Sequence, residues 1–290
     1  MSAALAAEQA LNGLQLGLML FLMAAGLTLV LGIMDTINLA HGSLYMTGAY
    51  LAAATYAAAG SFLVAVAAAV VGTALIGALL EMTVLRALYR RDHLSQVLAT
   101  FAIILIANEA IRMTWGPQPL ALPTPRALSG PVELLPGFLY PAWRLVLIAA
   151  GLGVAVLLFI LVTYTRAGMR VRAGASNREM AEVMGVDVKR LFTVVFAIGA
   201  ALCALAGALL GPLLAVQVGM GESILILAFV VVVIGGIGSI RGAFVGALLV
   251  GIVDTAGRAL LVPALASIAI YVLMAAVLFW KPQGLFPARG

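Results

Sequence analysis

The sequence predicts an all-α integral membrane protein, a polytopic helical bundle of about eight to nine hydrophobic segments, some broken or re-entrant, with one short helix on the cytoplasmic side. Of the 290 residues, 64% are hydrophobic and 9% are charged, whereas about a quarter of the residues in a soluble domain are charged. The apolar runs are about 20 residues long, which is the length of a helix that crosses a bilayer. We therefore expect residues 1–290 to form a single transmembrane domain.

The first half of the chain contains five candidate spans. Residues 11–33 form the first and carry Gly13 and Gly17 at the spacing that lets two membrane helices approach closely. The second opens with a polar, glycine-interrupted stretch, 35–43, before it becomes apolar as far as residue 59. Residues 61–85, 94–115 and 144–164 follow, with a proline-rich loop at 116–143 that we expect to be stiff but irregular and extracytoplasmic.

The second half contains four further apolar runs after a polar region at 165–190. Apolar runs cover residues 191–216, 223–234, 243–262 and 264–280, and a second glycine-broken stretch, 235–242, separates two of them. The number of crossings depends on whether the two glycine-broken stretches span the membrane or re-enter it.

Basic residues indicate the orientation. Three of the 16 Lys and Arg residues lie in 86–91, six in 166–190 and two in the tail that follows residue 280. Cytoplasmic loops of membrane proteins carry such an excess, so we expect these three places to face the cytoplasm. The net charge of +5 then has an explanation that does not involve nucleic acid.

The polar region 165–190 contains the signals of a short helix. Ser176 precedes Glu179 by three residues, which is the spacing of a capping box. Gly185 is suited to ending the helix because it adopts the left-handed conformation without strain. A helix of about two turns is not stable alone in water, so we expect it to dock onto a partner. Its apolar face comprises Met180, Val183 and Met184, rimmed by Arg178, Glu179 and Glu182.

Several classes of site lack the residues that they need. The only lysines, Lys189 and Lys281, do not lie in a phosphate-binding G-x-x-x-x-G-K-[ST] loop. The two histidines, His41 and His93, are far apart and have no accompanying cluster of cysteines or carboxylates, so we expect no metal site. No set of catalytic residues is apparent, so an enzyme is not expected. The single cysteine, Cys203, is interpreted as a small packing residue.

The two glycine-broken stretches are candidates for a substrate path. Irregular backbone at membrane depth is tolerated where protein or a water-filled path covers it, and interrupted segments in the two halves of a transporter often mark the binding site. The alternative is that both stretches are ordinary turns at the membrane surface. The candidate path residues are Asn38, His41, Gly42, Ser43, Gly235, Gly236, Gly238 and Ser239.

Carboxylates within apolar runs are functional candidates because they are costly there. Glu109 with Arg112 and Asp254 with Arg258 have spacings that allow pairing on one helix face. A structural ion pair near the outer membrane surface is the simpler interpretation of both. Glu81 is expected to point to the cytoplasmic surface.

Four separated motifs resemble one known family. The runs MDTINLAHGSLYMTGAY, SNREMAEVMGVDVKRLF with AIGAALCALAGALLGP, GGIGSIRGAFVGALLVGIVDT and WKPQGLFP occur in this order over nearly the whole chain. Together they resemble the branched-chain amino acid type permeases of bacterial ABC importers, and the chain is similar to the shorter of the two permease types that pair in such systems.

The resemblance implies a multi-pass subunit of the bacterial inner (plasma) membrane that imports a small polar solute from the periplasm. Its implied partners are a second permease, two cytoplasmic ATPases that hold ATP and Mg²⁺, and a periplasmic substrate-binding protein; this chain itself binds no cofactor. The polar region 165–190 would be the coupling loop and its short helix the coupling helix. Glu179, Ala181 and Gly185 align with the E-A-A…G motif of such loops, although Met180 stands where the stricter motif has Ala.

Two questions stay open at the level of sequence. Relatives in this family are associated with leucine-like amino acids, urea, short amides and aromatic acids, and the pairing of permeases can be homodimeric or heterodimeric. The alternative function is a stand-alone secondary transporter or channel that uses Glu109 or Asp254 for ion coupling.

Overall fold

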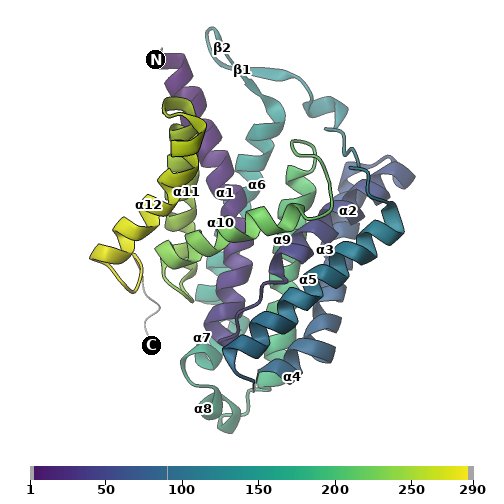
Figure 1. Cartoon of the computed structure of the whole chain (residues 1–290), viewed down its shortest axis with the longest axis vertical. Helices are drawn as coiled ribbons and strands as arrows, with labels where there is room; N and C mark the ends of the chain where they lie inside the picture. The colour runs from purple at the N-terminus through teal and green to yellow at the C-terminus, as the bar shows by residue number, and fades with distance from the viewer. Residues whose placement is uncertain (1–2, 90, 287–290) are drawn as a thin grey trace.

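The computed structural model describes residues 3–89 and 91–286, so Arg90 of the first basic loop and residues 287–290 of the tail lie outside the described residues. Long helices run roughly along one axis, and the shorter α10 crosses between them (Figure 1). The elements are α1 (Ala3–Met34), α2 (His41–Ala59), α3 (Phe62–Leu80), the π-helix η1 (Glu81–Leu85), α4 (Arg86–Leu88), α5 (His93–Trp115), the 3₁₀ turn η2 (Arg126–Leu128), β1 (Pro131–Leu135), β2 (Phe138–Pro141), α6 (Ala142–Tyr164), α7 (Arg166–Ser176), α8 (Arg178–Val183), α9 (Val188–Leu210), α10 (Met220–Gly235), α11 (Ile240–Leu260) and α12 (Pro263–Trp280).

The expected all-α membrane architecture is confirmed. Within the described residues, six stretches are helical, long and apolar enough to cross a membrane, and α10 and α12 are apolar but shorter. With α2 they make nine hydrophobic segments, which agrees with the predicted eight to nine. The six stretches are Leu5–Met34, Phe62–Leu88, His93–Trp115, Ala142–Tyr164, Val188–Leu210 and Ile240–Leu260.

Helix α1 forms the centre of the bundle, where α6, α9, α10 and α11 pack around it. The predicted close approach through small residues is confirmed. A Cβ atom on Gly17 would lie 2.8 Å from the carbonyl oxygen of Ala247 on α11, and one on Gly251 would lie 2.4 Å from the carbonyl oxygen of Gly13. These distances leave no room for a side chain, so glycine is what permits the two helices to touch along their backbones.

Helices α2 and α9 approach equally closely. A Cβ atom on Gly48 of α2 would lie 2.3 Å from the Cα atom of Ala204, and one on Gly207 of α9 would lie 2.3 Å from the carbonyl oxygen of Tyr45. The short α2 is therefore held against the long α9 by backbone contact rather than by large side chains.

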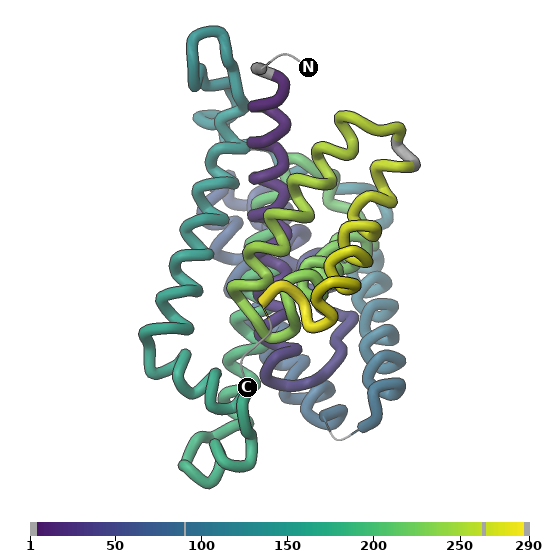
Figure 2. Tube along the Cα trace, turned by 90° about the vertical axis from the view of Figure 1, so that its left-hand side faces the viewer, coloured from purple at the N-terminus to yellow at the C-terminus, as the bar shows by residue number. Residues whose placement is uncertain are grey.

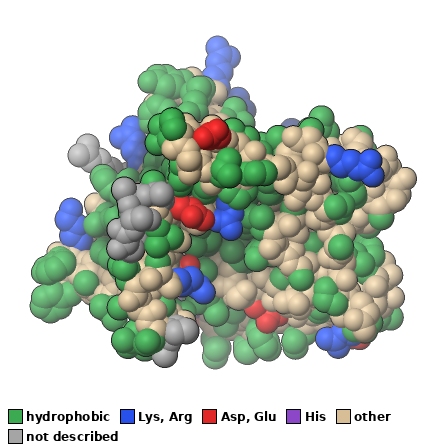
Figure 3. Space-filling model, turned by 90° about the horizontal axis from the view of Figure 1, so that it is seen from above, with side chains coloured by type: hydrophobic (Ala, Val, Ile, Leu, Met, Phe, Trp, Pro, Cys, Tyr) green, Lys and Arg blue, Asp and Glu red, His purple; other side chains and the backbone are tan. Residues whose placement is uncertain are grey.

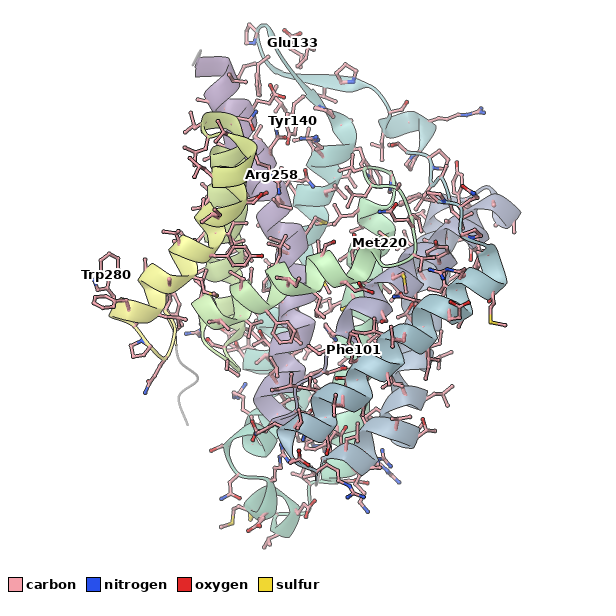
Figure 4. All side chains as sticks on the ribbon, in the orientation of Figure 1. Phe101, Glu133, Tyr140, Met220, Arg258 and Trp280 are labelled. Carbon is pink, nitrogen blue, oxygen red and sulfur yellow. The ribbon has the colours of Figure 1, made fainter. Side chains whose placement is uncertain are left out.

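The proline-rich loop is more regular than expected. β1 and β2 form an antiparallel hairpin, whose turn uses Gly137 with a φ of 80°. Pro131 and Pro141 face each other at the open end of the ladder, where a missing N–H costs least. The hydroxyl of Tyr140 donates a hydrogen bond of 3.0 Å to Asn12 Oδ1, which joins the hairpin to α1 (Figure 4). The prediction of an irregular loop was wrong for this part.

The two ends of the bundle differ. In the tube view, α7 and α8 project as a compact loop at one end, and the hairpin and the start of α1 lie at the other (Figure 2). Seen from the hairpin end, the surface carries scattered charged side chains among apolar and neutral ones (Figure 3). At the side of the bundle, Trp280 at the end of α12 points away from the protein (Figure 4).

Candidate transport and docking sites

The short helix of the polar region is α8, and its N-cap residue is not the predicted one. α7 continues through Ser176, so Ser176 is not at an N-cap and the predicted capping box with Glu179 was wrong. The next residue, Asn177, leaves the helical conformation with a φ of −155°, and its side chain accepts a hydrogen bond of 2.9 Å from the backbone N–H of Met180. Gly185 has a φ of +84°, so its predicted left-handed conformation at the helix end is confirmed.

The apolar face of α8 has no cover within the described residues. Met180, Val183 and Met184 are 58%, 82% and 77% exposed. Between them Ala181 is buried, and its carbonyl oxygen accepts a hydrogen bond of 3.0 Å from the backbone N–H of Val186. The helix therefore has one anchored side and one large apolar side that faces outward.

Arg178 connects α8 to the membrane helices. Its Nε donates a hydrogen bond of 3.1 Å to the carbonyl oxygen of Ile33 in the last turn of α1, and its guanidinium lies 5.1 Å from the ring centre of Phe192 on α9. The sequence placed Arg178 on the rim of the docking face, and this was wrong because its side chain turns inward. Arg178 therefore links α8 to both α1 and α9.

A second connection lies at the same end of the bundle, around a carboxylate that sequence reasoning misplaced. Glu81 was expected at the cytoplasmic surface, but its side chain is fully buried. One carboxylate oxygen of Glu81 accepts hydrogen bonds from Arg86 Nη2 at 3.0 Å and from the Thr193 hydroxyl at 2.6 Å. The other accepts hydrogen bonds from Tyr89 Oη at 2.9 Å and from Arg86 Nε at 3.3 Å.

The π-helix η1 explains this arrangement. Arg86 follows Glu81 by five residues, and five is the hydrogen-bond interval of a π-helix, whereas in an α-helix of 3.6 residues per turn the two side chains would point apart. Burial raises the pKa of Tyr89, and the negative charge of Glu81 raises it further, so Tyr89 remains a hydrogen-bond donor. Thr193 lies on α9, only a few residues after the α8 loop, so the Glu81 network joins η1 to α9.

The first glycine-broken stretch is buried beside α9 and α10. His41 is inaccessible to solvent, and its Nε2 lies 3.0 Å from Cys203 Sγ on α9. Gly42 contacts Gly221 of α10, where an added Cβ would lie 2.4 Å from a carbonyl oxygen. Asn38 accepts a hydrogen bond of 3.0 Å from the backbone N–H of Ala40. The predicted path residues Asn38, His41, Gly42 and Ser43 therefore lie inside the protein.

Some buried polar atoms near this stretch have no hydrogen-bond partner among the described residues. They include Asn38 Nδ2 and the hydroxyl of Tyr45, one turn after His41. Gln96, by contrast, forms hydrogen bonds through both of its amide atoms. Its Nε2 donates to the carbonyl oxygens of Leu88 and Arg91, and its Oε1 accepts from the backbone N–H of Ile37. Sequence reasoning missed Gln96 and Tyr45, because neither interrupts an apolar run conspicuously.

The second glycine-broken stretch is a tight turn between α10 and α11. Gly236 and Gly238 have φ values of 104° and 80°, and Ser239 Oγ accepts a hydrogen bond of 3.1 Å from the backbone N–H of Gly242 as the N-cap of α11. An added Cβ on Gly235 would lie 2.4 Å from the backbone of Gly242. The tail packs against this stretch: the backbone N–H groups of residues 285 and 286 donate hydrogen bonds to the carbonyl oxygens of Ile234 and Gly235 at the end of α10.

The two stretches contact different parts of the bundle. His41 packs on α9, whereas Gly238 lies against Gly32 near the end of α1, where an added Cβ would lie 2.7 Å from the Cα of Gly238. The first stretch therefore contacts α9 and α10, whereas the second contacts the end of α1.

The sequence profile of the family described as "branched-chain amino acid transport system / permease component" matches residues 9–278. The chain belongs to this family of permeases. Among its relatives is the high-affinity branched-chain amino acid transport system permease protein LivH of Escherichia coli K12, which is 31% identical over 96% of this chain and 94% of its own length. The corresponding permease protein BraD of Pseudomonas aeruginosa is 30% identical over the same shares. No solved structure matches the chain significantly.

Two further ion pairs of this permease each lie on a single helix. Glu109 and Arg112 form an exposed ion pair of 3.3 Å, and Asp254 and Arg258 form one of 2.8 Å in which only Asp254 is buried (Figure 4). The predicted pairings are confirmed. Neither the family nor these contacts favours the alternative of a stand-alone ion-coupled transporter. Within residues 3–89 and 91–286, no group of three or more His, Cys, Asp or Glu side chains could hold a metal ion.

Proposed function

We propose that this permease is the membrane subunit of an ATP-driven importer that moves a branched-chain amino acid, or a related small polar solute such as an amide, urea or an aromatic acid, across the bacterial inner membrane into the cytoplasm. The relatives LivH and BraD are named for branched-chain amino acid transport, which supports this substrate class first. The proposed partners are a second permease, two ATPases that bind ATP and Mg²⁺, and a periplasmic binding protein.

The observation that carries the proposal is the uncovered apolar face of α8. A helix of six residues is too short to be stable by itself, and it presents Met180, Val183 and Met184 to water at one end of the bundle. Such a face suits insertion into a groove of another protein, as short amphipathic helices do. Because this chain has no phosphate-binding loop, an ATPase is the partner that an active importer requires there.

The contacts of α8 supply a route from that partner to the membrane helices. Movement of the groove that holds α8 would act through Arg178 on α1 and on Phe192 of α9. The Glu81 network would carry the motion of α9 to η1 and α3. Helix α2, which begins at the buried His41 just after Asn38, is packed against α9 and would move with it. No covalent chemistry on the substrate is needed.

The proposal is tested by introducing a negative charge on the apolar face of α8. Val183→Asp and Met184→Asp place a charge on an exposed apolar surface, so the chain should still insert at normal abundance. We expect both variants to lose ATP-dependent leucine uptake in cells, and to lose co-purification of proteins that carry the G-x-x-x-x-G-K-[ST] motif, as identified by mass spectrometry. Glu182→Gln, on the exposed polar side of the same helix, is the matched control and should retain both. Uptake and co-purification at normal levels in both aspartate variants would refute docking through α8.

A further inference from the structure

An apolar groove on the side of the bundle lies apart from the docking helix and meets the second glycine-broken stretch only at Ile240 and Arg241. It lies between α6 and α11, with α1 behind it, and has a volume of about 450 Å³. Its floor is formed by Phe21 and Phe244, whose rings meet edge to face at 5.2 Å. Its walls include Leu152 and Val156 of α6, both exposed. In Figure 2, α6 and α11 flank α1 on the side that faces the viewer.

One charged side chain stands in this apolar lining. The guanidinium of Arg241 lies 5.6 Å from the ring centre of Phe159 on α6. Among the described residues, no carboxylate and no hydrogen-bond acceptor pairs with Arg241, and its side chain is exposed. An arginine fork that lacks an anion is suited to a phosphate group, which it can bind through two parallel hydrogen bonds.

The position of Arg241 along the bundle fits a membrane interface. Phe159 lies five residues before the end of α6, which is about 8 Å along a helix axis. Its ring meets the ring of Tyr164, the exposed last residue of α6, at 6.1 Å. Aromatic side chains of this kind gather at the level of lipid headgroups. The basic helix α7 follows immediately, so Arg241 lies near the bilayer surface on the side of the α7–α8 loop.

From this arrangement we propose that the groove binds one anionic phospholipid of that leaflet, with an acyl chain between α6 and α11 and the phosphate on Arg241. Apart from Phe286 of the tail, the walls come from two membrane-spanning helices, so we expect lipid or another membrane helix as the occupant. Another membrane helix would leave the guanidinium of Arg241 without a counter-charge unless it carried an acidic side chain at that level, which is costly in a membrane. The groove instead has the size of a site for a single small ligand, and its only charge matches that of an anionic headgroup.

The test is native mass spectrometry of the purified chain in mild detergent with equal amounts of phosphatidylglycerol and phosphatidylcholine that carry identical acyl chains. We expect the chain to retain phosphatidylglycerol preferentially, and Arg241→Gln to weaken that retention about fivefold, the effect of one basic residue near an anionic surface. Arg170→Gln removes an exposed arginine of α7 outside the groove and should leave retention unchanged. Val156→Trp fills the groove from its exposed side and should reduce retention of both lipids.

Three results would overturn the proposal. The first is equal retention of both lipids by the unmodified chain, with no effect of Arg241→Gln. The second is displacement of the bound phosphatidylglycerol by soluble glycerol phosphate, which would indicate a phosphate site that needs no acyl chain. The third is a dimer of this chain that Val156→Trp abolishes, which would make a second copy the occupant. None of these measurements depends on an ATPase, so the lipid site can fail or hold independently of the proposed transport function.

Discussion

Removing Arg86 alone should be more costly than removing both members of the Glu81–Arg86 pair. The side chain of Glu81 is fully buried, whereas that of Arg86 is 36% exposed. Arg86→Gln leaves a buried carboxylate without a counter-charge, and breaking a buried pair in this way costs about 3 to 5 kcal/mol of folding free energy. We expect about 3 kcal/mol, the lower end, because Tyr89 and Thr193 still donate hydrogen bonds to Glu81.

The reverse change should be milder. Glu81→Gln leaves the arginine with access to water, so its loss should be that of a partly exposed pair and one charged hydrogen bond, about 1.5 kcal/mol. In the double variant no buried charge is left unpaired, and we expect about the same cost as for Glu81→Gln alone. The two changes should therefore be strongly non-additive, as contacting residues are in a double-mutant cycle.

The assay is the free energy of unfolding of the purified chain in mixed micelles, titrated with a denaturing detergent. Arg112→Gln is the control, because the Glu109–Arg112 pair is more than half exposed on both sides and should contribute less than about 0.5 kcal/mol. The account would be refuted if Glu81→Gln were as costly as Arg86→Gln, or if the two costs simply added. Either result would mean that the carboxylate is hydrated and that η1 is not tied to α9.

Three further predictions concern packing, capping and the candidate path. Gly48→Ala should cost about 1 to 3 kcal/mol of unfolding free energy, because its Cβ would lie 2.3 Å from Ala204 and overpack α2 against α9. The control Gly153→Ala has nothing within 4 Å of the added Cβ and should not destabilise the chain. Equal costs for the two variants would contradict the close approach of α2 and α9. Asn177→Ala should cost about 1 kcal/mol as a lost N-cap and Ser176→Ala much less, measured as protection of α8 from proteolysis; the opposite order would restore Ser176 as the cap. Tyr45→Phe removes a buried hydroxyl without a partner, so it should leave folding intact but change the KM of leucine uptake if the start of α2 lines the path. Tyr50→Phe, further along α2, is the control. An unchanged KM in both variants would indicate that the glycine-broken stretch 35–43 is only a turn.

The features visible in the sequence were those set by local residue types. Gly13 and Gly17 predicted a close helix contact because small residues at this spacing let two membrane helices approach along their backbones. Gly185 predicted a helix end because glycine adopts the left-handed conformation most readily. Runs of about 20 apolar residues likewise predicted the spans, since the bilayer sets their length.

The errors arose where two local solutions compete. Ser176 and Asn177 are both good N-caps, and α7, which was not predicted from the sequence, continues through Ser176 and leaves Asn177 as the cap. Glu81 was misplaced because the sequence shows neither the π-helix η1 nor the buried partners Tyr89 and Thr193 that the carboxylate meets there. The hairpin at Pro131 was missed because proline density suggested irregular structure, although the prolines lie at its ends.

The candidate path depended on contacts between distant parts of the chain. His41 and Cys203 are separated by 162 residues and lie 3.0 Å apart, which no local pattern in one sequence indicates. The same holds for Thr193, which meets Glu81 across 112 residues. Such pairs are fixed by the tertiary packing of α2 and η1 on α9, and only the structure reveals them.

The most direct test of the proposed transport function is leucine uptake into vesicles that contain this permease with and without its co-purifying ATPases. We predict uptake only when this permease, the second permease, the ATPases, the binding protein and ATP on the ATPase side of the vesicle membrane are all present. A protonophore should have no effect. Leucine uptake by this chain alone, driven by an ion gradient and abolished by the protonophore, would contradict the account.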